Sequence, residues 1–323
     1  MFFRIKKFLY GLILRFTPAQ IPQKISLRAA KQKFTGVNPN RYADPVVINK
    51  IQQIVDEKKI DIIWFNYAFW AYYPIERLHV LKIVDTHDLL HQRLKIAMEK
   101  GVAPRGIFAT KEEEKNWLKK FDRVVAIQEK EAEQLLQLGV QHIYTIGHVM
   151  EFHSKKTNAK HFNIGFIGSI NQVNLSSLSF IETEIFDSLN ETDRNSFQFW
   201  VAGSIAQAST KADKHIFTLN KIEDFFSQID LLLNPVLEGT GLKIKNVEAL
   251  AFGIPVITTA KGAEGLEECT GALIIKETPE EMALEIKKIM ADPELRKHYS
   301  NTTQQFIAAY NNRQKHKLLA VLS

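Results

Sequence analysis

The residues best suited to chemistry follow a short apolar run, residues 229–233, that is typical of a buried strand. A glycine-rich turn comes next, and its centre consists of Gly239, Thr240 and Gly241. A predicted helix follows and ends at Gly253. At the amino end of a helix the free backbone N–H groups and the helix dipole both favour an anion. A strand, a glycine turn and a helix in this order therefore predict an anion-binding site.

Charged residues on this predicted helix indicate which kind of anion the site binds. Lys243 and Lys245 lie in its first turns, where the helix dipole ordinarily favours acidic residues. Two cations at that position indicate a ligand that carries phosphate. Glu248 lies further along the same helix, and its carboxylate can accept hydrogen bonds from two ribose hydroxyl groups. The expected chemistry is the binding of a nucleotide.

The stretch GTGLKIKNVEALAFGIPVITT, followed by GAEGL, resembles the donor-nucleotide site of retaining glycosyltransferases of family 4, which have the GT-B fold. The resemblance implies that Lys243 and Lys245 hold a diphosphate and that Glu248 binds a ribose. Where that family usually has a further acid, this chain has Thr240, with Glu238 two residues earlier. The donor-binding residues implied in this way are Gly168, Ser169, Glu238, Gly239, Thr240, Gly241, Lys243, Lys245 and Glu248. The alternative interpretation is an exposed basic helix in another kind of α/β protein.

A second motif, Asp85-Thr86-His87-Asp88, follows the predicted strand at residues 81–84. It resembles an element of related transferases in which the histidine approaches the donor sugar and the diphosphate. The resemblance implies a catalytic set of His87, Asp88 and Lys243. The alternatives are that His87 is a satisfied histidine at a strand end and that Asp88 caps the following helix.

Three further segments have competing interpretations. The segment 168–171, Gly-Ser-Ile-Asn, resembles the loop that contacts donor phosphates, but it also suits a plain turn that caps the next helix. Nearby Asn174 matches a common family pattern without an assigned role. The aromatic residues between 64 and 73 suit a buried core better than an acceptor groove. Residues 111–115, KEEEK, are expected to form a solvated helix face.

Strand-like and helical segments alternate along the chain, which predicts an α/β fold with two parallel sheets. The resemblance implies that these are two Rossmann-like domains facing a cleft. The expected domains are residues 1–155 on the acceptor side and residues 156–323 for the donor. The predicted strands are 60–65, 81–85, 123–126 and 142–146 in the first domain, and 163–169, 197–203, 215–217, 229–233, 256–258 and 272–275 in the second. The first domain is expected to be incomplete at its N-terminus, because the family usually opens with a strand and a glycine-rich loop.

Composition excludes several classes of protein. The chain has 323 residues, 45% hydrophobic and 24% charged, which suits two soluble domains. A single cysteine, Cys269, excludes an internal disulfide and a cysteine-based metal site, and no metal site is expected. No G-x-G-x-x-G opens either half, which disfavours a Rossmann dehydrogenase. The formal net charge is +6, but the basic excess lies before Asp44, which disfavours nucleic-acid binding.

Residues 2–16 form a predicted amphipathic helix with a basic stripe opposite an apolar one. Three interpretations remain open for it: attachment to an anionic membrane surface, packing on its own domain, and a signal peptide. No apolar run reaches the ~20 residues that a membrane-spanning helix needs. The protein is expected to be cytoplasmic, with peripheral attachment to the inner face of the cell membrane.

The expected function is transfer of a sugar, with retention, from a nucleotide diphosphate-sugar to a glycan or lipid-linked acceptor. We expect a role in cell-envelope polysaccharide biosynthesis, and no cofactor besides the nucleotide-sugar co-substrate. Two alternatives belong to other classes. One is a degenerate transferase that serves as a non-catalytic binding or scaffold subunit. The other is a nucleotide-sugar epimerase on the same fold.

Overall fold

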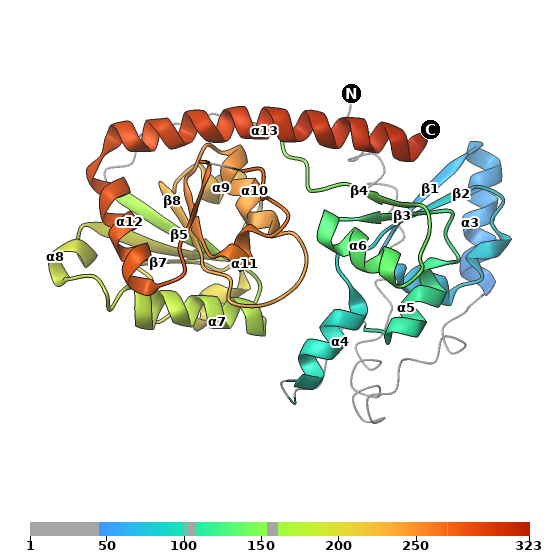
Figure 1. Ribbon diagram of the computed structural model, residues 1–323, viewed down its shortest axis with the longest axis horizontal. Helices are drawn as coiled ribbons and strands as arrows, with labels where there is room; N and C mark the ends of the chain where they lie inside the picture. Colours follow the sequence, from blue (N-terminus) through green and yellow to red (C-terminus); the bar gives the residue numbers. More distant parts are fainter. Residues whose placement is uncertain (1–44, 100, 102–107, 154–160, 270) are drawn as a thin grey trace. The chain divides into compact units, whose positions relative to one another are not determined.

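The computed structural model describes residues 45–99, 101, 108–153, 161–269 and 271–323. These residues form two compact units (Figure 1). Unit 1 contains the described residues up to Gly147 together with Lys315–Ser323, and unit 2 is His148–Gln314. The predicted amphipathic helix at residues 2–16 and the predicted domain boundary at residue 155 lie outside the described residues.

Unit 1 contains a four-stranded parallel sheet in the order β1-β2-β3-β4. Its strands are β1 (Ile62–Asn66), β2 (Leu81–Asp85), β3 (Arg123–Ala126) and β4 (Ile143–Thr145). The central strands are short apolar runs, and Ile83, Val84, Val124 and Val125 are at most 1% exposed. Strands of a parallel sheet are covered on both faces, which explains why their sequences show no polar alternation.

Helices and 3-10 turns cover the faces of this sheet. They are α3 (Pro45–Lys58), η2 (Ala68–Tyr72), η3 (Ile75–Arg77), α4 (Leu90–Glu99), α5 (Lys111–Leu118) and α6 (Glu129–Gln137). Phe65, Trp70 and Tyr72 belong to the larger core cluster, so most of the aromatic segment packs inside the unit as expected. On the opposite side, Val321 near the end of α13 (Pro293–Leu322) packs with Trp64.

Unit 2 contains a six-stranded parallel sheet in the order β10-β9-β8-β5-β6-β7. Its strands are β5 (Phe162–Ile167), β6 (Phe197–Ala202), β7 (Lys214–Ile216), β8 (Leu231–Asn234), β9 (Val256–Thr258) and β10 (Leu273–Ile275). The chain runs outward from β5 to β7, returns to β8 beside β5, and then runs outward to the other edge. The order therefore reverses between β5 and β8. In open α/β sheets ligands bind at such a reversal, beyond the carboxyl ends of the strands.

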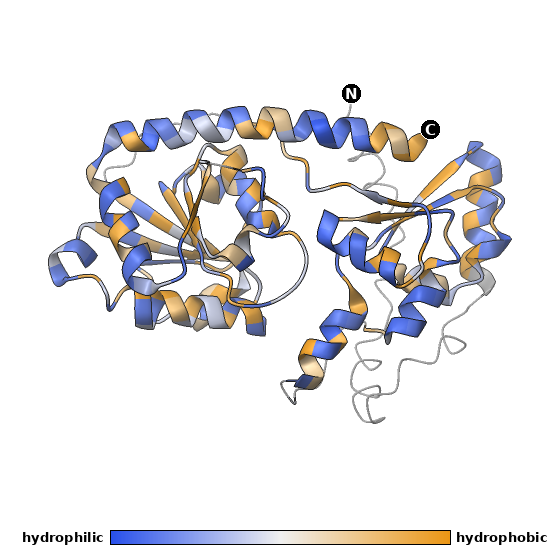
Figure 2. Ribbon diagram, viewed as in Figure 1, coloured by the Kyte–Doolittle hydropathy of each residue, from blue (hydrophilic) through white to orange (hydrophobic). Residues whose placement is uncertain are grey.

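Nine helical segments of unit 2 surround this sheet within the described residues. They are α7 (Gln172–Phe180), η4 (Ile181–Ile185), α8 (Glu191–Arg194), η5 (Ser204–Ala208), α9 (Glu223–Phe226), α10 (Ile244–Ala251), α11 (Ala260–Ala263), α12 (Pro279–Ala291) and the greater part of α13. Strands in both units carry mainly hydrophobic colours, whereas the covering helices alternate (Figure 2). This pattern is typical of helices that bury one stripe against a sheet.

The predicted fold class, two parallel-sheet α/β domains, is confirmed. Each predicted strand is present, with ends that differ by a few residues at most. An incomplete first domain stays a prediction, because it concerns residues outside the described part. In the described residues no helix is long and apolar enough to cross a membrane.

The expectation of a solvated helix face at residues 111–115 is wrong for one residue. Glu114 is fully buried. Its carboxylate oxygens accept hydrogen bonds from the backbone N–H groups of Leu90 and His91, at 2.9 Å each. These N–H groups begin α4 and have no partner inside that helix, so a carboxylate from α5 satisfies them. Tertiary packing therefore buries one acid of a segment that is otherwise polar.

Candidate functional site

The loop between β8 and α10 carries the residues that the sequence analysis selected first. Gly239 and Gly241 both have positive φ angles, 110° and 77°. Lys243 is the N-cap of α10, but its side chain makes no capping hydrogen bond to the helix. Instead its Nζ donates to the carbonyl oxygens of Thr240 and Gly241, at 3.0 and 2.7 Å. The lysine thus closes the loop on itself just before the helix begins.

The loop after β5 lies at the other side of the strand-order reversal. Asn171 caps α7, since its Oδ1 accepts a hydrogen bond from the backbone of Asn174 at 2.9 Å. The helix-cap interpretation of this segment is therefore correct for Asn171. Gly203, at the end of β6, packs against the same loop: a Cβ on it would lie 2.3 Å from the carbonyl oxygen of Gly168. Its φ of 86° also suits glycine. Gly203 therefore allows the end of β6 to pack directly against the loop after β5.

Asn174 joins these two loops, although the sequence analysis assigned it no role. Its Oδ1 accepts a hydrogen bond from Lys245 Nζ at 2.8 Å, and its Nδ2 donates to the carbonyl oxygen of Ser169 at 2.6 Å. Lys245 lies on α10, and Ser169 follows β5. The contact therefore connects the two sides of the strand-order reversal. No local signal in the sequence marks this role, because both partners of Asn174 are set by the tertiary structure.

Buried polar side chains fix α10 to the sheet. Asn234 Nδ2 donates to Asn246 Oδ1 at 2.7 Å, and Asn246 Nδ2 donates to the carbonyl oxygen of Gly262 at 2.8 Å. Thr258 Oγ1 donates to the carbonyl oxygen of Asn234 at 2.7 Å. Gly262 leaves the space for this network, because a Cβ there would lie 1.9 Å from Thr258 Oγ1. Buried networks of this kind hold neighbouring elements in one arrangement, although Asn234 Oδ1 has no hydrogen-bond partner among the described residues.

Burial shifts the pKa values of the two ionisable side chains of α10, Lys245 and Glu248, in opposite directions. Burial lowers the pKa of Lys245 to about 8, although the nearby Glu248 carboxylate acts against this shift. Burial likewise raises the pKa of Glu248 to about 7, against the attraction of Lys245. Lys245 Nζ also lies 4.9 Å from the centre of the Phe166 ring on β5. Shifts of this kind, caused by burial beside a partner charge, are common at functional sites.

One further residue of unit 2 approaches Glu248. His148 Nε2 lies 4.0 Å from Glu248 Oε1. The sequence analysis did not select His148, because it lies far from the motif along the chain and has no motif of its own. The side chains of α10 that face the candidate site are therefore a lysine bonded to Asn174 and a half-buried carboxylate beside a histidine.

The second predicted element, around His87, lies at the carboxyl ends of β1 and β2 in unit 1. His87 Nε2 is 3.0 Å from Asn66 Oδ1, and its backbone N–H donates to Asp85 Oδ1 at 3.3 Å. The Tyr67 ring lies 4.4 Å from the imidazole ring, centre to centre. Both His87 and Tyr67 have positive φ angles, 61° and 72°. Non-glycine residues in that region are strained, and such strain is concentrated at functional sites.

Asp88 does not cap α4, whose first N–H groups bind Glu114 instead. Its Oδ2 lies 3.7 Å from Arg93 Nη1, and its buried Oδ1 has no hydrogen-bond partner among the described residues. Burial raises the pKa of Asp88, against the pull of Arg93. The predicted catalytic set thus comprises two neighbouring residues of unit 1, His87 and Asp88, and one residue of unit 2, Lys243.

The predicted donor residues occupy one end of the unit 2 sheet. Gly168 and Ser169 lie after β5, residues 238–241 lie after β8, and Lys243, Lys245 and Glu248 lie on or beside α10. The loop after β8 lies close to the start of α7, since a Cβ on Gly239 would lie 3.5 Å from Val173. No group of three His, Cys, Asp or Glu side chains that could hold a metal ion occurs in the part of the chain that the structure describes.

Comparison with known proteins gives one family match. Residues 161–292, most of unit 2, match the family model described as glycosyl transferases group 1. No curated protein sequence is significantly similar to the chain.

Solved structures with the same fold cover most of the chain. Anabaena Alr3699/HepE in complex with UDP-glucose has a TM-score of 0.62 and 13% identity over 85% of this chain and 82% of its own. Sucrose-phosphate synthase from Thermosynechococcus elongatus has a TM-score of 0.62 and 15% identity over 85% and 76%. A glycosyltransferase from Rickettsia africae has a TM-score of 0.57 and 13% identity over 89% and 83%. Together the family match and these structures support a glycosyltransferase with the GT-B fold.

Proposed function

We propose that the protein transfers a sugar, with retention of configuration, from a nucleotide diphosphate-sugar to a glycan or lipid-linked acceptor, as a member of glycosyltransferase family 4. The observation that carries the proposal is the contact from Lys245 through Asn174 to Ser169. It brings the start of α10 and the loop after β5 together where the strand order reverses. Nucleotides bind at this place in open α/β sheets.

The donor diphosphate would lie at the amino end of α10. Lys243 gives this eight-residue helix no side-chain cap. The N–H groups of Ile244 and Asn246 donate to the carbonyl oxygens of Leu242 and Lys243, so the helix would favour phosphate mainly through its dipole. Lys245 supplies the positive charge, and its partial burial strengthens its interaction with an anion. A bound phosphate would keep Lys245 protonated at neutral pH, because an anion favours the charged form of a lysine.

Glu248 would accept hydrogen bonds from the ribose hydroxyl groups, one turn further along α10. Its raised pKa places the carboxyl near half-ionisation at pH 7. Hydroxyl donors favour the carboxylate form, because they bind the charged oxygens. His148, 4.0 Å away, can support the same negative charge when it is protonated.

The chemical step would depend on stabilising charge on the leaving diphosphate. Lys243 and Lys245 neutralise the negative charge that grows there, a role that bound metal ions have in other transferases. We expect the reaction to need no metal. His87 would contact the donor sugar or the diphosphate, with Asp88 beside it. We assign no protein nucleophile.

The cellular role is also a proposal. A UDP-sugar is the first donor to consider, because Anabaena HepE, which has a similar fold, was solved with UDP-glucose. We propose a cytoplasmic enzyme of cell-envelope polysaccharide biosynthesis that contacts an anionic membrane surface through residues 2–16. Basic amphipathic segments of this kind bind such surfaces.

Nucleotide binding tests the proposal. Thermal unfolding of the full chain would be followed with UDP, GDP, ADP and CMP, for the wild type, for Lys245→Ala and for Lys297→Ala. Lys297 is an exposed lysine of α13 and serves as the matched control. A nucleotide at one hundred times its dissociation constant stabilises the folded state by about 2.7 kcal/mol. We expect stabilisation by one nucleotide, kept in Lys297→Ala and weakened at least tenfold in affinity in Lys245→Ala.

Two results would contradict the proposal. Stabilisation that is the same in Lys245→Ala would place the nucleotide elsewhere. No stabilisation of a folded protein by any nucleotide would favour the non-catalytic alternative.

A further inference from the structure

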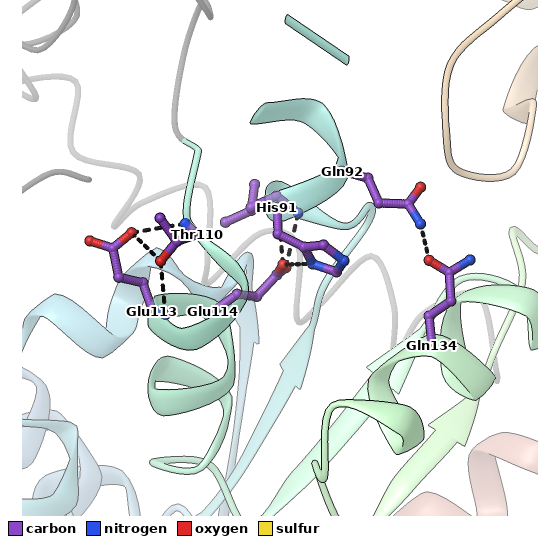
Figure 3. Close-up of polar contacts among 7 residues, drawn as sticks. His91, Gln92, Thr110, Glu113, Glu114 and Gln134 are labelled. Atoms are coloured by element: carbon purple, nitrogen blue, oxygen red, sulfur yellow. Dashed lines mark hydrogen bonds and ion pairs between the residues drawn. The ribbon is translucent and has the colours of Figure 1, made fainter. Parts of the chain in front are cut away.

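A buried histidine and glutamate in unit 1 form a pair outside the predicted site. Glu114 Oε2 lies 2.5 Å from His91 Nδ1, and the same carboxylate accepts the backbone N–H groups of Leu90 and His91 (Figure 3). Glu114 is fully buried, and both of its carboxyl oxygens accept backbone N–H groups, so we assign the proton of this contact to Nδ1. This fixes the ring so that the other nitrogen, Nε2, points away from the carboxylate.

The side chain of His91 is only 7% exposed, and Nδ1 is the ring nitrogen that contacts Glu114. His91 lines a cavity of about 470 Å³ between α4, α5 and α6. That volume lies within the range of small-molecule sites. A histidine that is held through Nδ1 and lines a cavity can offer Nε2 as an acceptor to a ligand with a hydroxyl or N–H donor.

The other lining residues indicate what kind of ligand the cavity suits. Most of them are amides and lysines, which can donate to oxygen atoms: Gln92, Lys95, Lys111, Gln134 and Gln137. Gln92 and Gln134 contact each other across the cavity wall and join α4 to α6 (Figure 3). An amide both donates and accepts, so it matches a hydroxyl group, which does the same.

The cavity lining also contains charged and apolar side chains. Lys95 lies 3.7 Å from Glu99, which also lines the cavity and offsets its charge. Ile96 and Leu138 are the apolar residues of the lining. A long apolar chain would leave the amides and Nε2 without partners. The lining therefore favours a polyhydroxylated group over a lipid chain.

We propose that this cavity binds a sugar residue, with His91 Nε2 accepting a hydrogen bond from one of its hydroxyl groups and with Gln134 binding another. Glu114 is a positioning residue, since it holds the imidazole by Nδ1. The proposal rests on the proposed transferase function for the choice of a sugar, which would belong to the acceptor glycan. The geometry of the pair and the cavity does not depend on that function.

Ligand-observed NMR of the full chain would test the site with simple probes: the methyl glycosides of glucose, galactose, mannose and N-acetylglucosamine. The variants are His91→Asn and Gln134→Leu, with Gln53→Leu on α3 as the matched exposed control. Asparagine places an amide N–H where Nδ1 stands, so it keeps the bond to Glu114 and removes only Nε2. We expect at least one probe to bind the wild type and Gln53→Leu equally, and at least five-fold more weakly to both cavity variants. The midpoint of thermal unfolding should change little in His91→Asn.

Three outcomes would overturn the proposal: no binding of any probe to the wild type, equal binding to His91→Asn, or binding weakened as much by Gln53→Leu. A parallel titration with UDP separates this result from the proposed function. UDP binding without sugar binding leaves the nucleotide site intact and rejects only the cavity. Sugar binding that is lost in the cavity variants, without UDP binding, supports the cavity and counts against the transferase.

Discussion

The two strand ends that carry the predicted residues are held in place by different means. In unit 2, the start of α10 is fixed by buried side chains that bond to one another, Asn234, Asn246 and Thr258. In unit 1, the ends of β1 and β2 place Tyr67 and His87 in strained backbone conformations. The first site is organised by packing, and the second stores conformational energy in its backbone.

This difference has a consequence for how each site tolerates change. A packed network loses several contacts when one atom is added or removed, so substitutions should be costly and should disturb binding. A strained residue is held against its own preference, so a substitution that relieves strain can stabilise the fold while it removes function. The following predictions test that contrast, from the largest expected effect to the smallest.

Gly203→Ala should be the most damaging single change near the unit 2 site. Its Cβ would lie 2.3 Å from the carbonyl oxygen of Gly168, and its φ is 86°. Both the clash and the backbone strain oppose folding, so we expect a loss of about 3 kcal/mol in the free energy of unfolding. Urea denaturation measures this loss, and UDP affinity should fall with it.

Gly271→Ala is the matched control for that change. Gly271 has a similar φ of 81°, but a Cβ there would meet its nearest atom at 3.6 Å. Only the conformational cost applies, which is about 1 kcal/mol. Equal losses in the two variants would show that the close approach to Gly168 is unimportant.

Glu248→Gln should change how stability depends on pH. The pKa of Glu248 is raised from 4.5 to about 7, so the folded state binds a proton more tightly than the unfolded state does. The wild type should therefore lose stability as pH rises from about 4.5 to about 7, and the glutamine variant should not. Relative to the variant, we expect the wild type to lose about 2 kcal/mol between pH 5 and pH 7.

Urea denaturation of both proteins at pH 5, 6 and 7 gives this difference, and titrating groups that do not interact with Glu248 cancel in it. A difference that stays constant with pH would mean that Glu248 is not held in a desolvated position. Packing would then not be what organises the unit 2 site at Glu248.

Tyr67→Gly tests whether the backbone of unit 1 is strained at Tyr67. Tyr67→Gly and Tyr67→Ala both lose the packing of the ring against His87, but only glycine relieves the positive φ of 72°. We expect the free energy of unfolding to rise by about 1 kcal/mol relative to Tyr67→Ala, which loses the ring but keeps the strain. Equal stability of the two variants, measured by urea denaturation, would argue against stored strain.

Asn171→Ala should have the smallest effect. It removes the side-chain cap of α7 and should cost about 1 kcal/mol, whereas Asn171→Ser should cost much less. Urea denaturation measures both. If Asn171 only caps the helix, UDP affinity should stay within two-fold of the wild type in Asn171→Ser. A larger loss of affinity in that variant would give Asn171 a direct role at the site.

Much of unit 2 could be predicted because its signals are local. The apolar runs that become β5, β6 and β8 are short and bounded by polar or glycine residues, and the helix after Gly241 carries its own charges. Asn174 and His148 could not be found in this way, because each gains its role from a residue that is distant in the sequence. Lys245 lies 71 residues from Asn174 along the chain.

The polar segment at residues 111–115 also shows that a local pattern does not determine a contact with a distant segment. Its composition predicts a solvated surface, and composition is a correct guide for most of its residues. Glu114 is buried because α4 begins beside it and needs an acceptor for its first N–H groups. No local pattern in KEEEK distinguishes the third acid from the first two.

The sequence by itself determined the alternation of strands and helices, the glycine turn before α10, and the charges at its amino end. These follow from residue preferences and spacing over a few positions. The tertiary structure alone decided the strand order β10-β9-β8-β5-β6-β7, the contact between Lys245 and Asn174, and the burial that brings the pKa values of Lys245 and Glu248 close together. Each of these depends on which distant segments pack side by side, because burial and charge interactions act through space and not along the chain.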